Sequence, residues 1–226
     1  DAPVVTARLR AIMADDLDAA AHCDIWRWQG DDAKLGAPPA GFAPLRADVA
    51  SGYPIRMAQP LTVQGVLAFE VSQAPESALR AGEGLLGLLA RAGAGDTILA
   101  QELDEPTFWG SSASNVVDDP NPRLEAYLAA ARRGASVRLL LDAYFDNQNL
   151  DDPRSNLRTV EYLTAIAAEE GLDLQARRGN PTGLGLHNKM TLAEIGGRGW
   201  VMAGSLNGGE VSTKLNREVA LIVGSD

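Results

Sequence analysis

Hydrophobic and polar positions change period along this chain, and the change divides it into predicted strands and helices. Alternation or short apolar runs indicate strands, and spacings of three and four residues indicate helices. Strands are predicted at 63–71, 97–102, 137–142, 172–177, 186–195, 200–205 and 218–223, and helices at 75–92, 123–133 and 157–170. The glycine-rich residues 196–199 predict a tight hairpin turn. Helices between the first strands, followed by consecutive strands, predict an α/β sandwich with a mixed β-sheet flanked by helices.

The first part of the chain has a different pattern. Residues 5–21 carry apolar side chains at helical spacing, and residues 23–61 contain tryptophans and prolines but no sustained period. We therefore expect two parts: an N-terminal helix with an irregular Trp/Pro-rich connection over 1–61, and an α/β domain over 62–226.

Composition narrows the classes of protein. The chain has 226 residues, of which 46% are hydrophobic and 22% are charged, as in soluble globular proteins. Its net charge of -10 disfavours a dedicated nucleic-acid binder, because the overall field repels polyanions. No apolar run approaches the ~18 residues that predict a membrane-spanning helix. One cysteine excludes an intrachain disulfide. We expect a soluble protein, with its compartment, including export, left open.

Three short segments near the C-terminus carry the candidate chemistry. They are His187-Asn188-Lys189, Gly204-Ser205-Leu206-Asn207 and Asn216-Arg217-Glu218. Residues two apart on a strand share a face, so the imidazole and the ammonium are expected to lie together. Ser205 and Asn207 add neutral hydrogen-bonding groups, and Glu218 adds an acceptor that can orient an imidazole. Such a set can attack a phosphodiester without a metal.

Each of these residues also has a simpler interpretation. A strand histidine is often a core residue, Lys189 and Glu218 could be surface charges, and Ser205 and Asn207 could cap a turn. Metal-ligand residue types occur together at His22-Cys23-Asp24, but adjacent positions do not converge easily on one ion, so no metal site is expected. The acids Glu102, Asp104 and Glu105, with Trp109, follow a strand, where side chains either face ligands or pack.

Taken together, the segments resemble the signature of the phospholipase D superfamily, His-x-Lys-x4-Asp followed by Gly-Ser-x-Asn. The resemblance is strongest from Leu186 onward, and Glu194 stands where the family usually has Asp. It implies a phospholipase D-like fold over 62–226 and a phosphodiesterase without cofactor or metal. It further implies a histidine that forms a phosphohistidine, while lysines and asparagines hold the phosphoryl oxygens.

The superfamily builds one site from two such motifs, and this chain has one. The resemblance therefore implies a second motif-bearing half, from a homodimer or from the rest of a longer chain, of which residues 1–61 would be a preceding tail. An isolated monomer should have little or no turnover. The excess of acidic over basic residues favours a phospholipid or small diester over nucleic acid as substrate. The alternative is a non-catalytic phosphate-binding or assembly module of the same fold.

Overall fold

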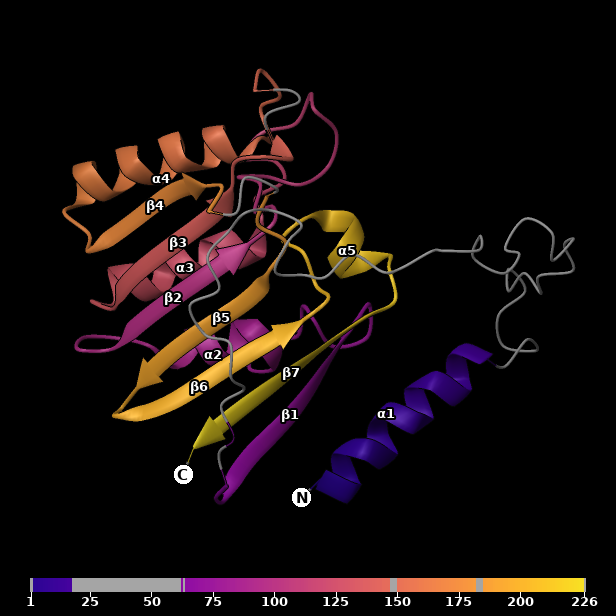
Figure 1. Cartoon of the computed structure of the whole chain (residues 1–226). Coiled ribbons are helices and arrows are strands. Elements are labelled where there is room, and N and C mark those ends of the chain that lie inside the picture. The colour runs from indigo at the N-terminus through magenta and orange to yellow at the C-terminus, as the bar shows by residue number, and fades with distance from the viewer. Residues whose placement is uncertain (1, 18–61, 63, 147–149, 182–184, 226) are drawn as a thin grey trace, which may run out of the picture. The chain divides into compact units, whose positions relative to one another are not determined.

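A computed structural model describes residues 2–17, 62, 64–146, 150–181 and 185–225 of the chain. The chain divides into two units, Asp1–Gln59 and Pro60–Asp226, and each is described by itself (Figure 1). In the first unit, α1 spans Ala2–Leu17, close to the helix predicted over 5–21. The predicted Trp/Pro-rich connection and His22-Cys23-Asp24 lie outside the described residues.

The second unit is built on a seven-stranded sheet with the order β1-β7-β6-β5-β2-β3-β4. The strands are β1 Leu67–Ala74, β2 Thr97–Glu102, β3 Ser136–Asp142, β4 Leu174–Gly179, β5 Lys189–Ile195, β6 Arg198–Gly204 and β7 Glu218–Ser225. Strands β2, β3 and β4 run parallel, whereas every pair among β1, β7, β6, β5 and β2 is antiparallel. The predicted mixed sheet in an α/β fold is therefore confirmed.

Helices cover one face of this sheet. Of them, α3 spans Pro122–Arg132, α4 spans Asn156–Glu170 and α2 spans Gly84–Arg91. The β2-α3-β3 and β3-α4-β4 connections join parallel neighbours, and right-handed crossovers in one direction place both helices on the same face. Leucines of the helices and the alternate residues of the strands form one core. Its fully buried members include Leu88, Leu124, Leu128, Leu163, Ile98, Val137, Leu141 and Ile222.

The helix predicted over 75–92 is only partly present. Residues before Gly84 form turns, and α2 begins at Gly84. The reason is local, because the φ angles of 84° at Gly82 and 57° at Gly84 do not allow a right-handed helix to continue through these residues, so α2 can only start there. A short helix that the periodicity did not indicate, α5, spans Glu210–Lys214 directly after the Gly-Ser-x-Asn segment.

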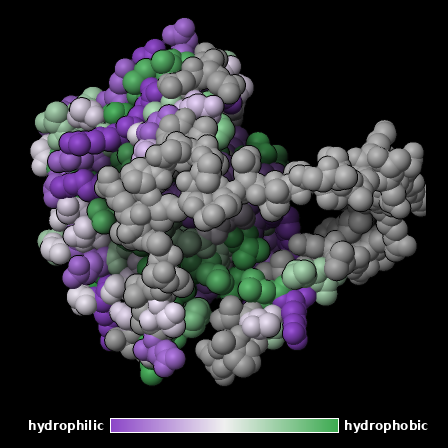
Figure 2. Space-filling view, in the orientation of Figure 1, coloured by the Kyte–Doolittle hydropathy of each residue, from purple (hydrophilic) through white to green (hydrophobic). Residues whose placement is uncertain are grey.

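The opposite face of the sheet carries an apolar surface that no helix of the described part of this unit covers. Strand register places Leu99, Leu192, Val201, Val223 and Phe69 in one row across five strands. Leu99, Val201 and Phe69 are 40–44% exposed. Figure 2 shows hydrophobic residues on this face, which Figure 1 presents to the viewer. Apolar surface of this extent is typical of an interaction face.

Candidate active site

Apart from Glu194, the motif residues lie at one end of the sheet. In the register, Lys189 at the start of β5 pairs with Glu102 at the end of β2, and Gly204 at the end of β6 pairs with Ala220 near the start of β7. Because neighbouring antiparallel strands alternate in direction, the beginnings of β5 and β7 meet the end of β6 at the same end of the sheet. We call this end, where the strands terminate, the edge. Segments as far apart in the sequence as Glu102 and Ala220 are thereby brought together.

His187 and Lys189 form a close pair at this edge. Lys189 Nζ lies 3.1 Å from His187 Nδ1 and 3.3 Å from His187 Nε2, and it donates a hydrogen bond of 3.0 Å to the carbonyl oxygen of His187. Which ring nitrogen can accept from the ammonium is set by the tautomer of the imidazole. His187 is exposed and does not enter the apolar core. It precedes β5 instead of lying within it, because β2, the pairing partner, ends opposite Lys189.

Asp142, at the buried end of β3, positions the loop that carries His187. Its Oδ1 accepts a hydrogen bond of 2.6 Å from the backbone of Leu186, and its Oδ2 accepts one of 2.6 Å from the backbone of Phe145. The ring of Phe145 lies edge-on to the imidazole of His187, with centroids 6.1 Å apart. From the sequence pattern, Asp142 is predicted only to lie in a strand. Its one signal was a carboxylate directly following a run of leucines.

The Gly-Ser-x-Asn segment divides into a structural serine and an inward-facing asparagine. Ser205 Oγ accepts a hydrogen bond of 3.1 Å from the backbone of Val219, so this hydroxyl ties β6 to β7. The Asn207 backbone donates a bond of 2.8 Å to Ser212 Oγ of α5. Gly208 follows with its amide 3.0 Å from the carbonyl oxygen of Asp104. A Cβ at Gly208 would meet that oxygen at 2.4 Å, so only glycine lets the two loops approach this closely.

Glu218 is held within its own loop. Its Oε1 accepts hydrogen bonds from Ser212 Oγ at 3.1 Å and from Asn216 Nδ2 at 3.3 Å. Among the described residues it makes no hydrogen bond with His187. The expected hydrogen bond from a catalytic histidine to Glu218 therefore stays a prediction. A histidine of another half could also donate this bond.

Glu194 lies away from this pair. It is exposed on β5 and pairs in register with Thr97 and Gly199. Side chains alternate along a strand, so Glu194 projects from the apolar open face, whereas Lys189 shares the face of Thr191. Its longer side chain, at the position where the related motif has Asp, therefore does not contact the His187–Lys189 pair.

A buried ionic cluster lies behind the edge. Arg123 Nη2 is 3.1 Å from Glu102 Oε1 and 3.0 Å from Glu105 Oε2, and all three side chains are at most 3% exposed. Burial alone would lower the pKa of Arg123, but the carboxylates of Glu105 and Glu102 outweigh it and raise that pKa. Burial raises the pKa of Glu102 well above its ordinary value. The cluster joins α3 to the loop after β2, and no spacing in the sequence indicates the pairing of Arg123 with these acids.

Carboxylates outnumber cations around Lys189. Burial lowers the pKa of Lys189, while the charges of Asp104, Glu102 and Glu218 oppose this change. Burial, with a further contribution from Glu105, raises the pKa of Asp104 to about 6, against the opposing charges of Arg123 and Lys189. The positive charge at this edge alone is therefore too small to balance a bound phosphate group.

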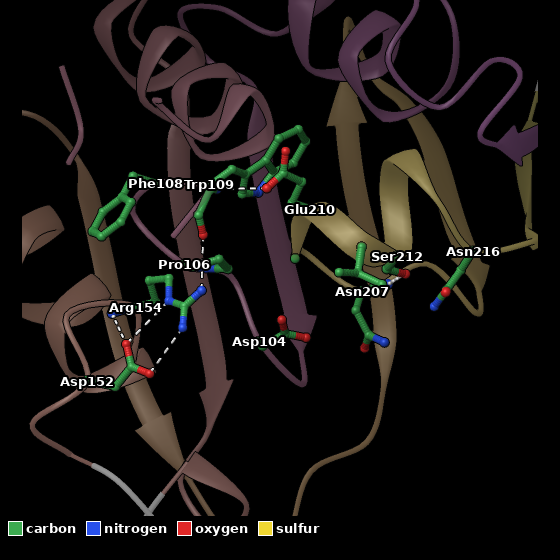
Figure 3. Close-up of a pocket in the computed structure, with 13 residues that line it drawn as sticks. Asp104, Pro106, Phe108, Trp109, Asp152, Arg154, Asn207, Glu210, Ser212 and Asn216 are labelled. Carbon is green, nitrogen blue, oxygen red and sulfur yellow. Dashed lines mark hydrogen bonds and ion pairs between the residues drawn. The ribbon is translucent and has the colours of Figure 1, made fainter. Parts of the chain in front are cut away.

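A cavity of about 430 Å³ lies beside the edge, between the loop after β2 and the loop that leads into α5 (Figure 3). Asp104, Trp109, Arg154, Asn207, Glu210 and Asn216 are among its lining residues. The Trp109 side chain is buried, and its indole Nε1 donates a hydrogen bond of 3.0 Å to the carbonyl oxygen of Gly208, so this residue is mainly a packing residue. Within the described part of the chain, no three His, Cys, Asp or Glu residues cluster as they would around a metal ion.

The raised pKa of Asp104 gives a stability prediction. A carboxyl with a pKa of about 6 in the folded state and about 4 in the unfolded chain destabilises the fold when ionised, so stability falls as the pH rises from about 4 to 6. Asp104→Asn removes this penalty. We expect it to raise the free energy of unfolding by about 2–3 kcal/mol more at pH 8 than at pH 4.

Urea unfolding at the two pH values measures this difference. Asp173→Asn is the matched control, because Asp173 is exposed and paired with Arg138 at 2.6 Å, which lowers the pKa of Asp173. A gain for Asp104→Asn that is equal at pH 4 and pH 8 would contradict the prediction.

Comparison with known proteins agrees with the motif. Residues 112–226 match the model of a family described as cardiolipin synthase, PLD-like domain. No curated protein sequence matched the chain. Within the described residues, no helix has the length and apolar character needed to cross a membrane.

Several solved structures are similar to this chain at low sequence identity. Nuc, a phospholipase D family member from Salmonella typhimurium, is 19% identical over 70% of this chain and 83% of its own, with a TM-score of 0.42. NucT from Helicobacter pylori is 18% identical over 70% and 86%, with a TM-score of 0.44. Phosphatidylserine synthase from Haemophilus influenzae is 12% identical over 72% of this chain and 36% of its own, with a TM-score of 0.47.

Proposed function

Because this chain belongs to the phospholipase D superfamily, through the PLD-like domain family of cardiolipin synthase, we propose that it cleaves or transfers a phosphodiester through a phosphohistidine at His187. The observation that carries the proposal is the contact between Lys189 and His187, 3.1 Å from Nζ to Nδ1, at the edge where Asn207 also lies. An exposed imidazole beside a cation has the arrangement of a nucleophile that meets an anionic substrate.

In the proposed reaction an unprotonated nitrogen of His187 attacks phosphorus, and a P–N bond replaces the bond to the leaving alcohol. A second histidine, from the partner half, protonates the leaving oxygen. The same residue then removes a proton from water or an alcohol, which attacks the phosphohistidine and releases His187. Lys189 and Asn207 hold the equatorial oxygens, where negative charge is concentrated in the transition state. Ser205 and Glu218 support these residues by fixing the two loops.

The excess of negative charge around Lys189 supports the proposal that a second half completes the site. Burial lowers the pKa of Lys189, and the negative charges of Asp104, Glu102 and Glu218 near it oppose this change. A phosphodiester anion would meet more negative than positive charge at this edge, and a second motif would contribute another lysine and another histidine. The half could come from a second copy of the chain or from the rest of a longer protein.

The substrate we propose is a phospholipid or a small diester in preference to nucleic acid. The net charge of -10 disfavours a long polyanion, because the field of the whole protein acts on every phosphate of the ligand.

Sedimentation combined with a turnover assay tests the two-half requirement. We expect the monomer to have little or no activity on a fluorogenic phosphodiester, and activity per chain to rise with the dimer fraction, or to appear only in a longer protein that supplies the second motif. Inactivity in all three forms would favour a phosphate-binding or assembly module. A strictly monomeric chain with full, His187-dependent turnover would contradict the two-half mechanism.

A further inference from the structure

The imidazole of His187 has few neighbours that fix its orientation. Among the described residues, its two ring nitrogens lie near a single polar atom, Lys189 Nζ, at 3.1 Å and 3.3 Å. An atom in line with the lone pair of one nitrogen would be much farther from the other, so these nearly equal distances show that the ammonium is aligned with neither. The described part of the chain therefore offers neither nitrogen a fixed in-plane hydrogen-bond partner, the usual means of orienting a catalytic imidazole.

The ring of Phe145 is the other neighbour of the imidazole. The two rings have an interplanar angle of 68°, and their centroids are 6.1 Å apart. Aromatic rings attract each other in such edge-to-face arrangements, and each ring then limits the rotation of the other. This limit matters because the terminal torsion of a histidine side chain has broad minima and turns easily. Phe145 therefore supplies a restraint that the polar contacts of His187 do not supply.

Phe145 is itself held in place, although its side chain is 45% exposed. Its backbone amide donates a hydrogen bond of 2.6 Å to Asp142 Oδ2, and Asp142 Oδ1 accepts one of 2.6 Å from Leu186, the residue before His187. One buried carboxylate thus joins the segment that carries the ring to the segment that carries the imidazole. The ring also occupies the space beside Gly185, where a Cβ would lie 2.5 Å from Phe145 Cε2. A side chain at Gly185 would therefore displace the ring.

We propose that Phe145 is a positioning residue for His187, whose ring holds the imidazole in the orientation from which a nitrogen reaches phosphorus. This inference rests on the proposed function, in which His187 is the nucleophile. Attack requires that the reacting atoms be aligned, and a misplacement of about 1 Å can lower a rate about a hundredfold. Phe145 acts through His187 and takes no part in making or breaking bonds.

Relaxation of the His187 ring tests the positioning without requiring turnover. The chain has two histidines, and His187→Asn identifies the ring resonances of His187 by their loss. In the ¹³C-labelled full chain, we expect an order parameter of about 0.85 for the ring C–H groups, and a fall below about 0.6 in Phe145→Leu, which keeps apolar bulk but removes the ring. A ring that is already flexible in the unchanged chain, or one that Phe145→Leu leaves equally ordered, would overturn the inference.

Kinetics of the active assembly give a second readout. Phe145→Leu should lower kcat about ten- to a hundredfold and leave KM within about twofold, because alignment is lost while Lys189 and Asn207 still meet the phosphate. Phe145→Tyr keeps the ring and should retain kcat within about threefold. A higher KM with unchanged kcat would show that Phe145 binds the substrate directly, and it would overturn the inference.

Tyr144→Leu is the matched control for both readouts. Tyr144 lies in the same loop and is 43% exposed, and its ring meets that of Phe145 but makes no ring contact with His187. We expect this variant to keep the order parameter near about 0.85 and kcat within about threefold. Equal effects of the two leucine variants would overturn the assignment to Phe145.

The two readouts also separate this inference from the proposed function. A His187 ring that loses order in Phe145→Leu, in a protein without phosphodiester turnover in any assembly, would leave the orienting role of Phe145 standing and refute the proposed function. Turnover that depends on His187 but not on Phe145 would support the proposed function and overturn this inference.

Discussion

Replacing His187 with asparagine is expected to lower phosphodiester turnover of the active assembly by roughly a thousandfold or more, as loss of a nucleophile does in enzymes. Asparagine keeps a polar side chain of similar reach but cannot form a phosphoramidate of comparable stability or exchange a proton near neutral pH. Because His187 is exposed, its replacement should leave stability almost unchanged. The measurements are the initial rate on a fluorogenic diester and the melting temperature of each variant.

The control for this variant lies in the same segment. Glu194→Gln changes the motif position at which the related signature has Asp, and its exposed side chain projects from the other face of the sheet. We expect its rate to stay within about threefold of the unchanged chain, in line with a surface substitution. A His187→Asn variant that keeps a tenth or more of the activity would contradict the nucleophile assignment.

A chelator tests whether the attack on phosphorus requires a metal ion. We expect EDTA to leave the rate of the unchanged chain intact, because the proposed nucleophile is the imidazole of His187 and the proposed charge stabilisation comes from Lys189 and Asn207. Inhibition that zinc or magnesium restores would show that a metal takes part. The lower activity of the His187 variant would then have to be explained by loss of a metal ligand.

Replacing Arg123 with methionine is expected to destabilise the domain by about 3–5 kcal/mol, the largest loss of stability that we predict. Arg123 Nη2 lies 3.1 Å from Glu102 and 3.0 Å from Glu105. The substitution removes this cation and leaves both carboxyls buried. Urea unfolding of the purified chain measures the change. The loop with Asp104 depends on this cluster, so loss of phosphate-ligand binding should accompany the destabilisation.

Arg132→Met, on the same helix, is the matched control. Arg132 pairs with Glu170 at 2.6 Å, but both side chains are more than one third exposed, so this change should cost at most about 1 kcal/mol. If Arg123→Met does not fold, adding Glu102→Gln and Glu105→Gln should restore folding, because the uncompensated charges are then gone. Equal losses for the two arginine variants would contradict the account of the buried cluster.

Much of the architecture was predictable from the sequence because strands and helices bury one face each and leave a period of two or 3.6 in the pattern. The parallel strands around 97–102 and 137–142 and the helices that follow them have this local cause. The glycine turn has another local cause, the positive φ of Gly196 and Gly197 between β5 and β6. The boundaries were less predictable. The helix expected from residue 75 begins at Gly84, because glycines with positive φ interrupt it.

The motif residues were also identifiable from the sequence, since His187 and Lys189 are two residues apart and their relation needs only local geometry. Their proximity is observed at 3.1 Å. The supporting residues were not identifiable. Asp142 reaches the Leu186 amide across 44 residues of sequence, and Arg123 meets Glu102 and Glu105 from the next helix, contacts that leave no period in the sequence.

The sequence by itself determined the α/β class, the order of most elements and the candidate residues for attack on a phosphodiester, because these follow from periodicity and short spacing. The tertiary structure decided the rest. It decided that Ser205 ties two strands, that Glu218 accepts a hydrogen bond from Ser212 of α5, and that Asp104 and Asn207 line one cavity. These outcomes depend on which strand ends meet at one edge of the sheet, and strand order is set by long-range pairing and burial.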